Sequence, residues 1–303
     1  MRKTTTIAAV AAVLVLAGWQ RAVLAGMDYP AFIASTNPVG WWGMNEAGAV
    51  TATADLSGTY GLAHNGVGVA MDMTYNAPGI TTTTGVAGFV NGPGNKATYF
   101  AGNNPYSVSA GATTNGVMDS NTSHPVYHYP SGFSCEAWIK RDGVTRINGP
   151  TVMAGREWAF GFVEESGSYT DALHFITFTK QDYFSANGVI PDDGQWHQIG
   201  VSWDGATSTA SFFVDGVGAG TQIASTPGMR NATDPSFNTF NLGRRVISTT
   251  GQEFRGWLDE AVVWDRQRTA ADFTASYAAA VPEPATLSLL TLGGLAVIRK
   301  RRK

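Results

Sequence analysis

Short alternating segments separated by turn residues are the feature that most restricts how this chain folds. The clearest pair runs from Trp196 to Trp203 and from Ser208 to Gly216, with apolar residues at alternate positions. Asp204-Gly205 in the loop between them indicates a hairpin, because glycine accepts positive φ at little cost. A period of two places successive side chains on opposite faces of a sheet. The pattern therefore predicts antiparallel β structure.

The same pattern recurs along the chain, where 36 glycines and many polar residues separate segments rich in Val, Ile, Phe, Trp and Tyr. Repeated short strands of this kind are typical of a sandwich or a barrel. Further strands are expected at 39–44, 97–101, 133–140, 151–154, 159–164, 172–179, 237–242 and 254–264. One alanine-rich helix is expected at 269–279, with Thr269 as its cap. Residues 61–95 and 102–131 are polar and glycine-rich, and we expect surface loops there, where binding residues usually lie.

The N-terminal residues have the order of parts of a secretory signal peptide. Arg2 and Lys3 precede an apolar run at 7–18. The residues around Ala25 are small or medium-sized, as a signal-peptide cleavage site requires, so cleavage is expected after Ala25. The apolar run is about a dozen residues long, whereas a membrane-spanning helix needs roughly 17–25, so an uncleaved anchor is the lesser alternative. We therefore expect residues 1–25 to form a short signal helix that is removed.

The C-terminal residues 281–303 also have three parts in order. A Pro-Glu-Pro motif precedes an apolar run at 285–298, and a basic run ends the chain; the residues concerned are Pro282, Glu283, Pro284, Arg299, Lys300, Arg301, Arg302 and Lys303. Five cations hold this end on the cytoplasmic side by the positive-inside rule, which leaves the domain outside. A permanent anchor is the alternative, but 14 residues rise only about 21 Å against a bilayer core of about 30 Å.

This tripartite end resembles the PEP-CTERM sorting signal. The resemblance implies an exosortase-type processing enzyme as a partner. It also implies that the hydrophobic helix holds the protein in the inner membrane until C-terminal processing. The protein would then reach the cell surface or the extracellular matrix.

Residues 26–280, between the two signals, have the size of one sandwich domain. They carry 12 Lys and Arg against 22 Asp and Glu, a net charge of −10, because eight of the 20 cations lie in the terminal signals. Such an acidic domain repels phosphate backbones, which argues against nucleic-acid binding. The single cysteine, Cys135, allows no intramolecular disulfide. It shares a strand face with Phe133, Ala137 and Ile139, so we expect a core residue rather than a reactive thiol.

Several blocks of this domain follow one another in a recognisable order. They lie at 41–48, 54–58, 97–102, 133–140, 193–199, 213–216, 241–244 and 254–264. Examples are Phe-Ser-Cys-Glu-Ala-Trp-Ile-Lys at 133–140 and Phe-Arg-Gly-Trp-Leu-Asp-Glu at 254–260. Together they resemble the laminin-G-like family of concanavalin A-like lectin/glucanase sandwiches. The resemblance implies an all-β fold, a two-sheet antiparallel jelly-roll sandwich, over residues 26–280.

That superfamily includes glucanases, so paired carboxylates decide whether catalysis is expected. A retaining glycosidase holds two carboxyl groups about 5–5.5 Å apart, which on one strand requires acids two positions apart. Asp259 and Glu260 are adjacent, so alternation predicts that they face opposite ways, and Glu164-Glu165 fails in the same way. The glucanase-like pattern Glu-x-Asp-x-x-Glu is absent from the sequence. We therefore predict a non-catalytic protein with no catalytic residue.

Calcium is the metal most compatible with an acidic domain, because it takes oxygen ligands. Glu46, Asp55 and Asp259 stand in the first and last family-like blocks, which the resemblance brings together, and they are the candidate ligands. The alternative is that Asp55 and Asp259 cap turns. His197 lies beside apolar strand positions and is expected to be a hydrogen-bonded structural residue. His124 and His128 are interpreted as polar loop residues.

The predicted function follows from export combined with a lectin-like fold. Most of the nine tryptophans should be core, while one or two on an exposed face would stack on sugars. The sequence thus predicts non-catalytic binding of a glycan, with exopolysaccharide as the ligand class. A structural matrix protein without a specific ligand is the first alternative, and a glycan hydrolase is the second.

Overall fold

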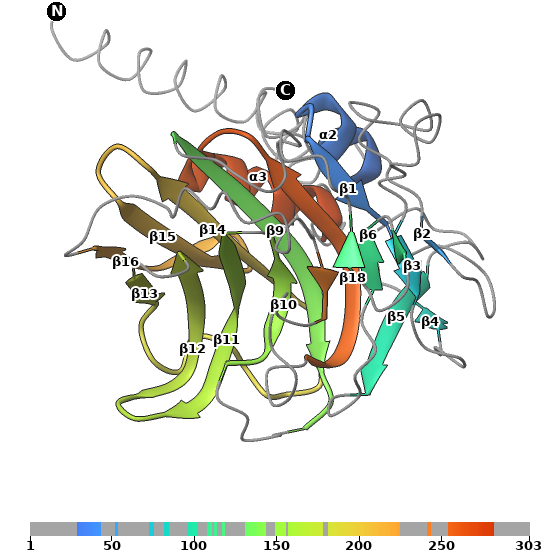
Figure 1. The fold of residues 1–303 in the computed structure, drawn as a ribbon, viewed down its shortest axis with the longest axis horizontal. Coiled ribbons are helices and arrows are strands. Elements are labelled where there is room, and N and C mark those ends of the chain that lie inside the picture. Colours follow the sequence, from blue (N-terminus) through green and yellow to red (C-terminus); the bar gives the residue numbers. More distant parts are fainter. Residues whose placement is uncertain are drawn as a thin grey trace, which may run out of the picture.

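The chain folds, in a computed structural model, into two β-sheets that face each other (Figure 1). The structure describes residues 29–43, 131–143, 149–155, 157–177, 181–224, 241–243 and 254–281, together with short strands at 52–53, 73–75, 82–84, 96–101, 108–110, 112–113 and 117–118. The predicted signal at 1–25, its cleavage residue Ala25 and the residues from Pro282 to Lys303 lie outside the described residues.

Sheet A contains the strands for which the alternating sequence pattern is clearest. Its order is β16-β15-β14-β9-β18-β5-β4, and β1 also pairs with β18. The strands are β1 (Gly40–Trp42), β4 (Thr82–Thr84), β5 (Lys96–Ala101), β9 (Gly132–Arg141), β14 (His197–Asp204), β15 (Thr209–Val214), β16 (Val217–Ile223) and β18 (Arg255–Trp264). All these pairings are antiparallel.

Sheet B has the order β13-β12-β11-β10-β17-β6-β3-β2 and is likewise antiparallel. Its strands are β2 (Ala52–Thr53), β3 (Met73–Tyr75), β6 (Val108–Ala110), β10 (Thr151–Ala154), β11 (Trp158–Ser166), β12 (Tyr169–Thr177), β13 (Gln181–Phe184) and β17 (Asn241–Leu242). A separate pair joins β7 (Ala112–Thr113) and β8 (Val117–Met118). This arrangement confirms the predicted two-sheet sandwich.

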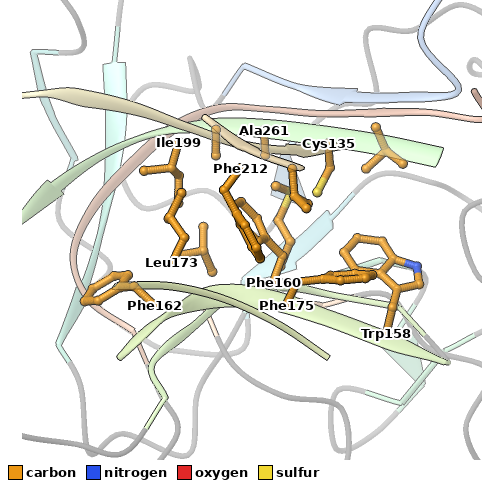
Figure 2. Close-up of a cluster of buried hydrophobic side chains, with 14 of the residues drawn as sticks. Cys135, Trp158, Phe160, Phe162, Leu173, Phe175, Ile199, Phe212 and Ala261 are labelled. Carbon is orange, nitrogen blue, oxygen red and sulfur yellow. The ribbon is translucent and has the colours of Figure 1, made fainter. Parts of the chain in front are cut away.

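The main core lies between the two sheets (Figure 2). Sheet A contributes Cys135, Ile199 and Phe212 from neighbouring strands, and sheet B contributes Phe160 and Phe175 toward them. Each of these side chains is fully buried. Burial without a disulfide partner confirms Cys135 as a core residue, and desolvation raises the pKa of its thiol well above the usual range.

Two helices cover part of the outer face of sheet A (Figure 1). Helix α2 (Tyr29–Ser35) precedes β1, and helix α3 (Ala270–Ala280) follows β18. The structure confirms the predicted helix cap at Thr269, which forms a capping box with Asp272. Aromatic residues of α2, β1, β9 and β18 form a second apolar cluster beneath these helices. Within the described residues, neither helix has the length and apolarity that a bilayer crossing requires.

The structure adds elements that the sequence pattern did not indicate. Helix α2 and strands β13 and β16 were not predicted. The ranges 61–95 and 102–131, expected to be loops, contain β3, β4, β6, β7 and β8 as two- or three-residue strands. Such short strands carry too few residues for a period to show.

Candidate functional site

Three aromatic side chains form a row on the outer face of sheet B. Strands β12 and β13 pair Phe175 with Tyr183, and both of these residues point into the core. Alternation therefore directs their neighbours in the ladder, His174 and Phe184, to the outer face. Tyr169, at the start of β12, completes this row, and all three rings are half-buried. We call Tyr169, His174 and Phe184 the aromatic row.

The rings of the aromatic row lie nearly parallel. The Phe184 centroid is 4.5 Å from that of His174, with 1° between the ring planes. It is 3.7 Å from the Tyr169 centroid, with 12° between the planes. Strict alternation would send Tyr169 to the core side, but Asp171 has a φ of 45° and interrupts the regular strand. Ring faces that stack on each other in this way are covered, so the row offers a ligand its ring edges and the outer faces of its end members, which suit C–H groups.

Hydrogen-bonding groups surround the aromatic row. Nε2 of His174 lies 3.1 Å from Oδ1 of Asp182, whose side chain is 59% exposed. The exposed Asn187 side chain bridges two backbone groups, since Nδ2 donates to the Ser168 carbonyl at 2.9 Å and Oδ1 accepts from the Thr170 N–H at 3.2 Å. These groups are fixed by their neighbours before any ligand arrives. An apolar surface with a few fixed polar groups at its edge is the usual composition of a small-molecule site.

A second polar cluster lies beneath the helices on the outer face of sheet A. The carboxylate of Glu136 accepts hydrogen bonds from the hydroxyls of Tyr29, at 2.8 Å, and Ser276, and lies 3.3 Å from Nη1 of Arg268. Desolvation raises the pKa of Glu136, and Arg268 and the hydroxyl groups oppose this effect. Because Glu136 and Arg268 are buried, this cluster ties α2 and α3 to the sheet.

The prediction that Asp259 and Glu260 face opposite ways is wrong. Between Asp259 and Val262 the register of β18 against β9 shifts, and Glu260 has a φ of 50°. Asp259 pairs with Trp138, which belongs to the second apolar cluster beneath α2 and α3. Glu260 accepts a hydrogen bond from Trp41, which belongs to the same apolar cluster. A bulge sets two residues against one partner and so breaks alternation. Both carboxylates therefore lie on the face of sheet A that the helices cover, and each of the two residues is at most 1% exposed.

Of the candidate calcium ligands, only Asp259 lies among the described residues, since Glu46 and Asp55 fall outside them. Asp259 stands in the middle of β18 rather than at a turn. Within the described part of the chain, no three His, Cys, Asp or Glu side chains gather as metal ligands would. His124 and His128 also lie outside the described residues.

His197 is hydrogen-bonded, as the sequence predicted. Nδ1 lies 2.7 Å from Oδ2 of Asp215 and Nε2 lies 3.1 Å from Oδ1 of Asp193. The contact with Asp215 is the largest cause of the raised pKa of His197. Asp215 also accepts the backbone N–H of Gln198 at 3.0 Å, which anchors the β15–β16 turn against β14.

Tryptophan is not the exposed aromatic residue on sheet B. Six described tryptophans are at most 5% exposed, namely Trp41, Trp42, Trp138, Trp158, Trp203 and Trp264. Trp196 and Trp257 are half-buried. Trp196 packs against the second apolar cluster beneath the helices. Nζ of Lys140 lies 5.1 Å from the centroid of the Trp257 ring.

Sequence reasoning missed the aromatic row for two reasons. The predicted strand at 172–179 already placed His174 opposite in face to Leu173 and Phe175, which was the available signal. Strand β13 was not predicted, so Phe184 had no place beside His174. The approach of Tyr169 depends on the left-handed residue Asp171, which no local pattern indicates.

Comparison with known proteins agrees with the sandwich fold. Residues 111–273 match the family described as the concanavalin A-like lectin/glucanases superfamily. This is a laminin G type sequence profile that spans more than half of the chain, and the protein belongs to this family. Residues 280–303 match the PEP-CTERM protein-sorting motif. The chain is therefore a laminin-G-like sandwich protein that carries a sorting motif for export.

One solved domain has a similar fold over most of the chain, and a second solved protein resembles part of it. Domain 4 of AbnA, a GH43 extracellular arabinanase from Geobacillus stearothermophilus in complex with arabinotriose, is 15% identical, with a TM-score of 0.52. That match covers 80% of this chain and 98% of the domain. A putative carbohydrate binding protein from Bacteroides ovatus is 21% identical over 50% of this chain and 42% of that protein, with a TM-score of 0.40. No curated protein gives a significant match.

Proposed function

We propose that this protein is exported and binds a glycan at the cell surface or in the extracellular matrix, without cutting it. The observation that carries the proposal is the aromatic row of sheet B, with the exposed carboxylate of Asp182 at its edge. A sugar ring has an apolar face of C–H groups and a rim of hydroxyls. The outer ring face of Tyr169, at one end of the row, would receive the apolar face by stacking, and Asp182 and Asn187 would receive the hydroxyls.

The ligand class we propose is a neutral exopolysaccharide. The net charge of −10 over residues 26–280 disfavours acidic polymers, as it disfavours nucleic acid. The arabinanase domain of similar fold was solved with arabinotriose, so neutral arabino-oligosaccharides are suitable first probes.

Burial of the described carboxylates on β9 and β18 supports binding without hydrolysis. Glu136, Asp259 and Glu260 are each at most 1% exposed and lie under α2 and α3. A glycosidase must bring its two carboxyl groups to the scissile bond and, in the second step, to water. Carboxylates closed off by packed helices do not meet that requirement.

A glycan array probed with the full chain in mild detergent tests the proposal. Tyr169→Ala should lower affinity about two- to tenfold, the range of one aromatic contact. Tyr169→Phe keeps the ring and is the matched control, which should bind like the parent. Retention of full binding by Tyr169→Ala would exclude the aromatic row as the site.

Other outcomes of the same experiment identify the alternatives. A chain that binds no glycan would indicate a structural matrix protein. Release of reducing sugar, abolished by a single carboxylate-to-amide substitution, would indicate a glycan hydrolase.

We further propose that both terminal signals are processed. The PEP-CTERM motif at 280–303 supports processing by an exosortase-type enzyme near Pro282-Glu283-Pro284, after transient insertion in the inner membrane. The order of the N-terminal residues supports cleavage after Ala25. The intact mass of protein recovered from its native host should lack both ends. Recovery of a chain that still carries Lys303 would contradict C-terminal processing.

A further inference from the structure

A groove of about 660 Å³ opens on the outer face of sheet A, away from the aromatic row. Its floor is formed by β14, β15 and β16, and one wall is the segment from Gln267 to Ala270 that leads into α3. We call it the α3 groove. Its volume is within the range of small-ligand sites, which is about 300–1,000 Å³.

The floor of the α3 groove is a set of hydroxyl groups in strand register. Ser202 of β14 pairs with Ser211 of β15, and Ser211 pairs with Thr221 of β16. Neighbouring strands lie about 4.8 Å apart, so these side chains form a row across the sheet at that spacing. In the next row, Asp204 pairs with Thr209. Small hydroxyl side chains leave room above the sheet and offer both donors and acceptors.

Two phenylalanines belong to the lining of the α3 groove but expose little surface to it. Phe213 is 5% exposed and stacks on Phe273 of α3, with ring centroids 4.1 Å apart. Phe212 is fully buried in the main core. The surface available to a ligand therefore combines the polar groups of the floor with a larger area of apolar atoms, a mixture that also suits the two kinds of surface on a sugar ring.

Asp204 gives this surface a fixed negative charge. The Thr207 hydroxyl donates to Oδ2 of Asp204 at 2.8 Å, and the Ala206 N–H donates to Oδ1 at 2.9 Å. These bonds, that of the Thr207 hydroxyl above all, lower the pKa of Asp204. The Thr207 hydroxyl has one proton, which goes to the carboxylate, so Thr209 donates across the 2.8 Å contact with Thr207. Thr209 is thereby held with its lone pairs available.

Arg268 does not add a free positive charge to the α3 groove. Its Nη1 pairs with the buried Glu136 at 3.3 Å, and its Nη2 donates to the Asp272 carbonyl at 3.1 Å. The guanidinium also lies 4.1 Å from the Trp264 ring centroid. The lining thus combines hydroxyl groups, the Gln267 amide and one carboxylate, which disfavours anionic ligands and favours an uncharged, hydroxyl-rich one.

We infer that the α3 groove is a second glycan site, for a neutral oligosaccharide, and that the protein cross-links two glycan chains. The inference rests on the proposed function for its ligand class. The aromatic row and the α3 groove lie on the outer faces of opposite sheets. The main core, part of which is drawn in Figure 2, fills the space between these sheets. Two such sites on one domain join separate chains, which is a matrix-forming activity rather than simple attachment.

Gly218 offers a direct way to block the α3 groove. It lines the groove, and a Cβ added there would meet no atom within 4 Å. Gly218→Trp should therefore fill the groove and leave the fold intact. Val217→Trp is the matched control, because Val217 is 68% exposed, is adjacent in sequence and does not line the groove. Melting curves check that both variants remain folded.

Titration calorimetry of the full chain in mild detergent, with arabinohexaose and cellohexaose as probes, tests the inference. The parent and Val217→Trp should bind two molecules of a probe per chain, and Gly218→Trp should bind one. Thr221→Val, which removes one hydroxyl group, should weaken the groove site about two- to tenfold. Tyr169→Ala should weaken only the other site. The unmutated chain, mixed with the polysaccharide from which the bound probe is derived, should form cross-linked aggregates that make the solution turbid. Gly218→Trp, which retains one site, should give no turbidity.

The outcomes separate the two proposals. A single site that Gly218→Trp and Thr221→Val leave unchanged would overturn the α3 groove and retain the proposed function. No binding of either probe by the parent chain would overturn both. A single site lost in Gly218→Trp but kept in Tyr169→Ala would support the groove and overturn cross-linking and the aromatic row.

Discussion

At the scale of single residues, His197 links two segments through carboxylates. Its contact with Asp215, and secondarily that with Asp193, raises the pKa of the imidazole. The folded chain therefore binds this proton more tightly than the unfolded chain, in which the pKa is about 6.5. The stabilisation is fully present below about pH 6.5 and is lost as the pH rises through the raised pKa of the folded state.

The prediction from His197 is a change in pH dependence. Urea unfolding of the parent chain at about pH 5.5 and about pH 8.5, on either side of the histidine titration, should show a decline in stability across this window. His197→Gln keeps a polar side chain and does not titrate, so its decline should be smaller. Equal declines in parent and variant would show that other groups set the pH dependence.

Glu136 and Arg268 allow a second prediction at this scale. Glu136→Gln leaves the buried Arg268 without its counter-charge, which should cost about 3–5 kcal/mol of unfolding free energy. In Glu136→Gln combined with Arg268→Met the unpaired charge is gone, so the double variant should be less destabilised than the sum of the single ones. Denaturant midpoints and slopes measure both quantities. Additive losses would mean that the pair is not coupled.

At the scale of elements, the β15–β16 turn is shaped by contact with α3. Gly216 has a φ of 72°, and a Cβ added there would lie 2.9 Å from Cβ of Tyr277 and 3.0 Å from Cα of Thr274. Thr274 also donates its hydroxyl to the Gly216 carbonyl at 2.7 Å. The turn needs glycine both for its backbone conformation and for the approach of the helix.

Gly216→Ala should therefore destabilise the protein by more than the 1–2 kcal/mol that left-handed backbone costs an ordinary residue, because the contact with α3 must also widen. Gly218→Ala, two positions along β16, has open space and no positive φ. It should change stability by less than about 0.5 kcal/mol. Thermal unfolding of the two variants measures the difference, and similar losses would contradict the proposed contact.

At the scale of the whole molecule, the net negative charge of the domain leads to a prediction about calcium binding. The candidate residues are Glu46, Asp55 and Asp259, of which the structure describes the buried Asp259. If calcium binds the folded chain alone, it should add about 2.7 kcal/mol of stability at a hundredfold excess over Kd. The melting temperature of the full chain should rise with calcium and fall with a chelator, with magnesium as the control. Identical curves would remove calcium from the account.

Helices α2 and α3 bring residues near the two ends of the domain together. Tyr29 of α2 lies four residues after the predicted cleavage residue Ala25, and Ser276 of α3 lies six residues before Pro282. Both donate to Glu136. Residues near the two ends that we propose to be processed are therefore joined through one carboxylate on the outer face of sheet A.

The sequence alone determined the sandwich, most strands of sheet A, the capped helix at Thr269 and the burial of Cys135. Alternation, glycine turns and capping are local effects that residues a few positions apart decide, so they are readable in the chain. The family-like blocks lie mostly on these strands. The PEP-CTERM motif is also a local pattern, confirmed at 280–303.

Only the tertiary structure decided where the side chains of the candidate sites lie. The bulge at Glu260 arises from the pairing of β18 with β9, more than 100 residues away in sequence, and it reversed the expected direction of a carboxylate. The aromatic row requires Phe184 beside His174, and the α3 groove requires β16 beside β15 and the start of α3. Such sites depend on contacts between distant segments, and a contact between distant segments leaves no period in the sequence.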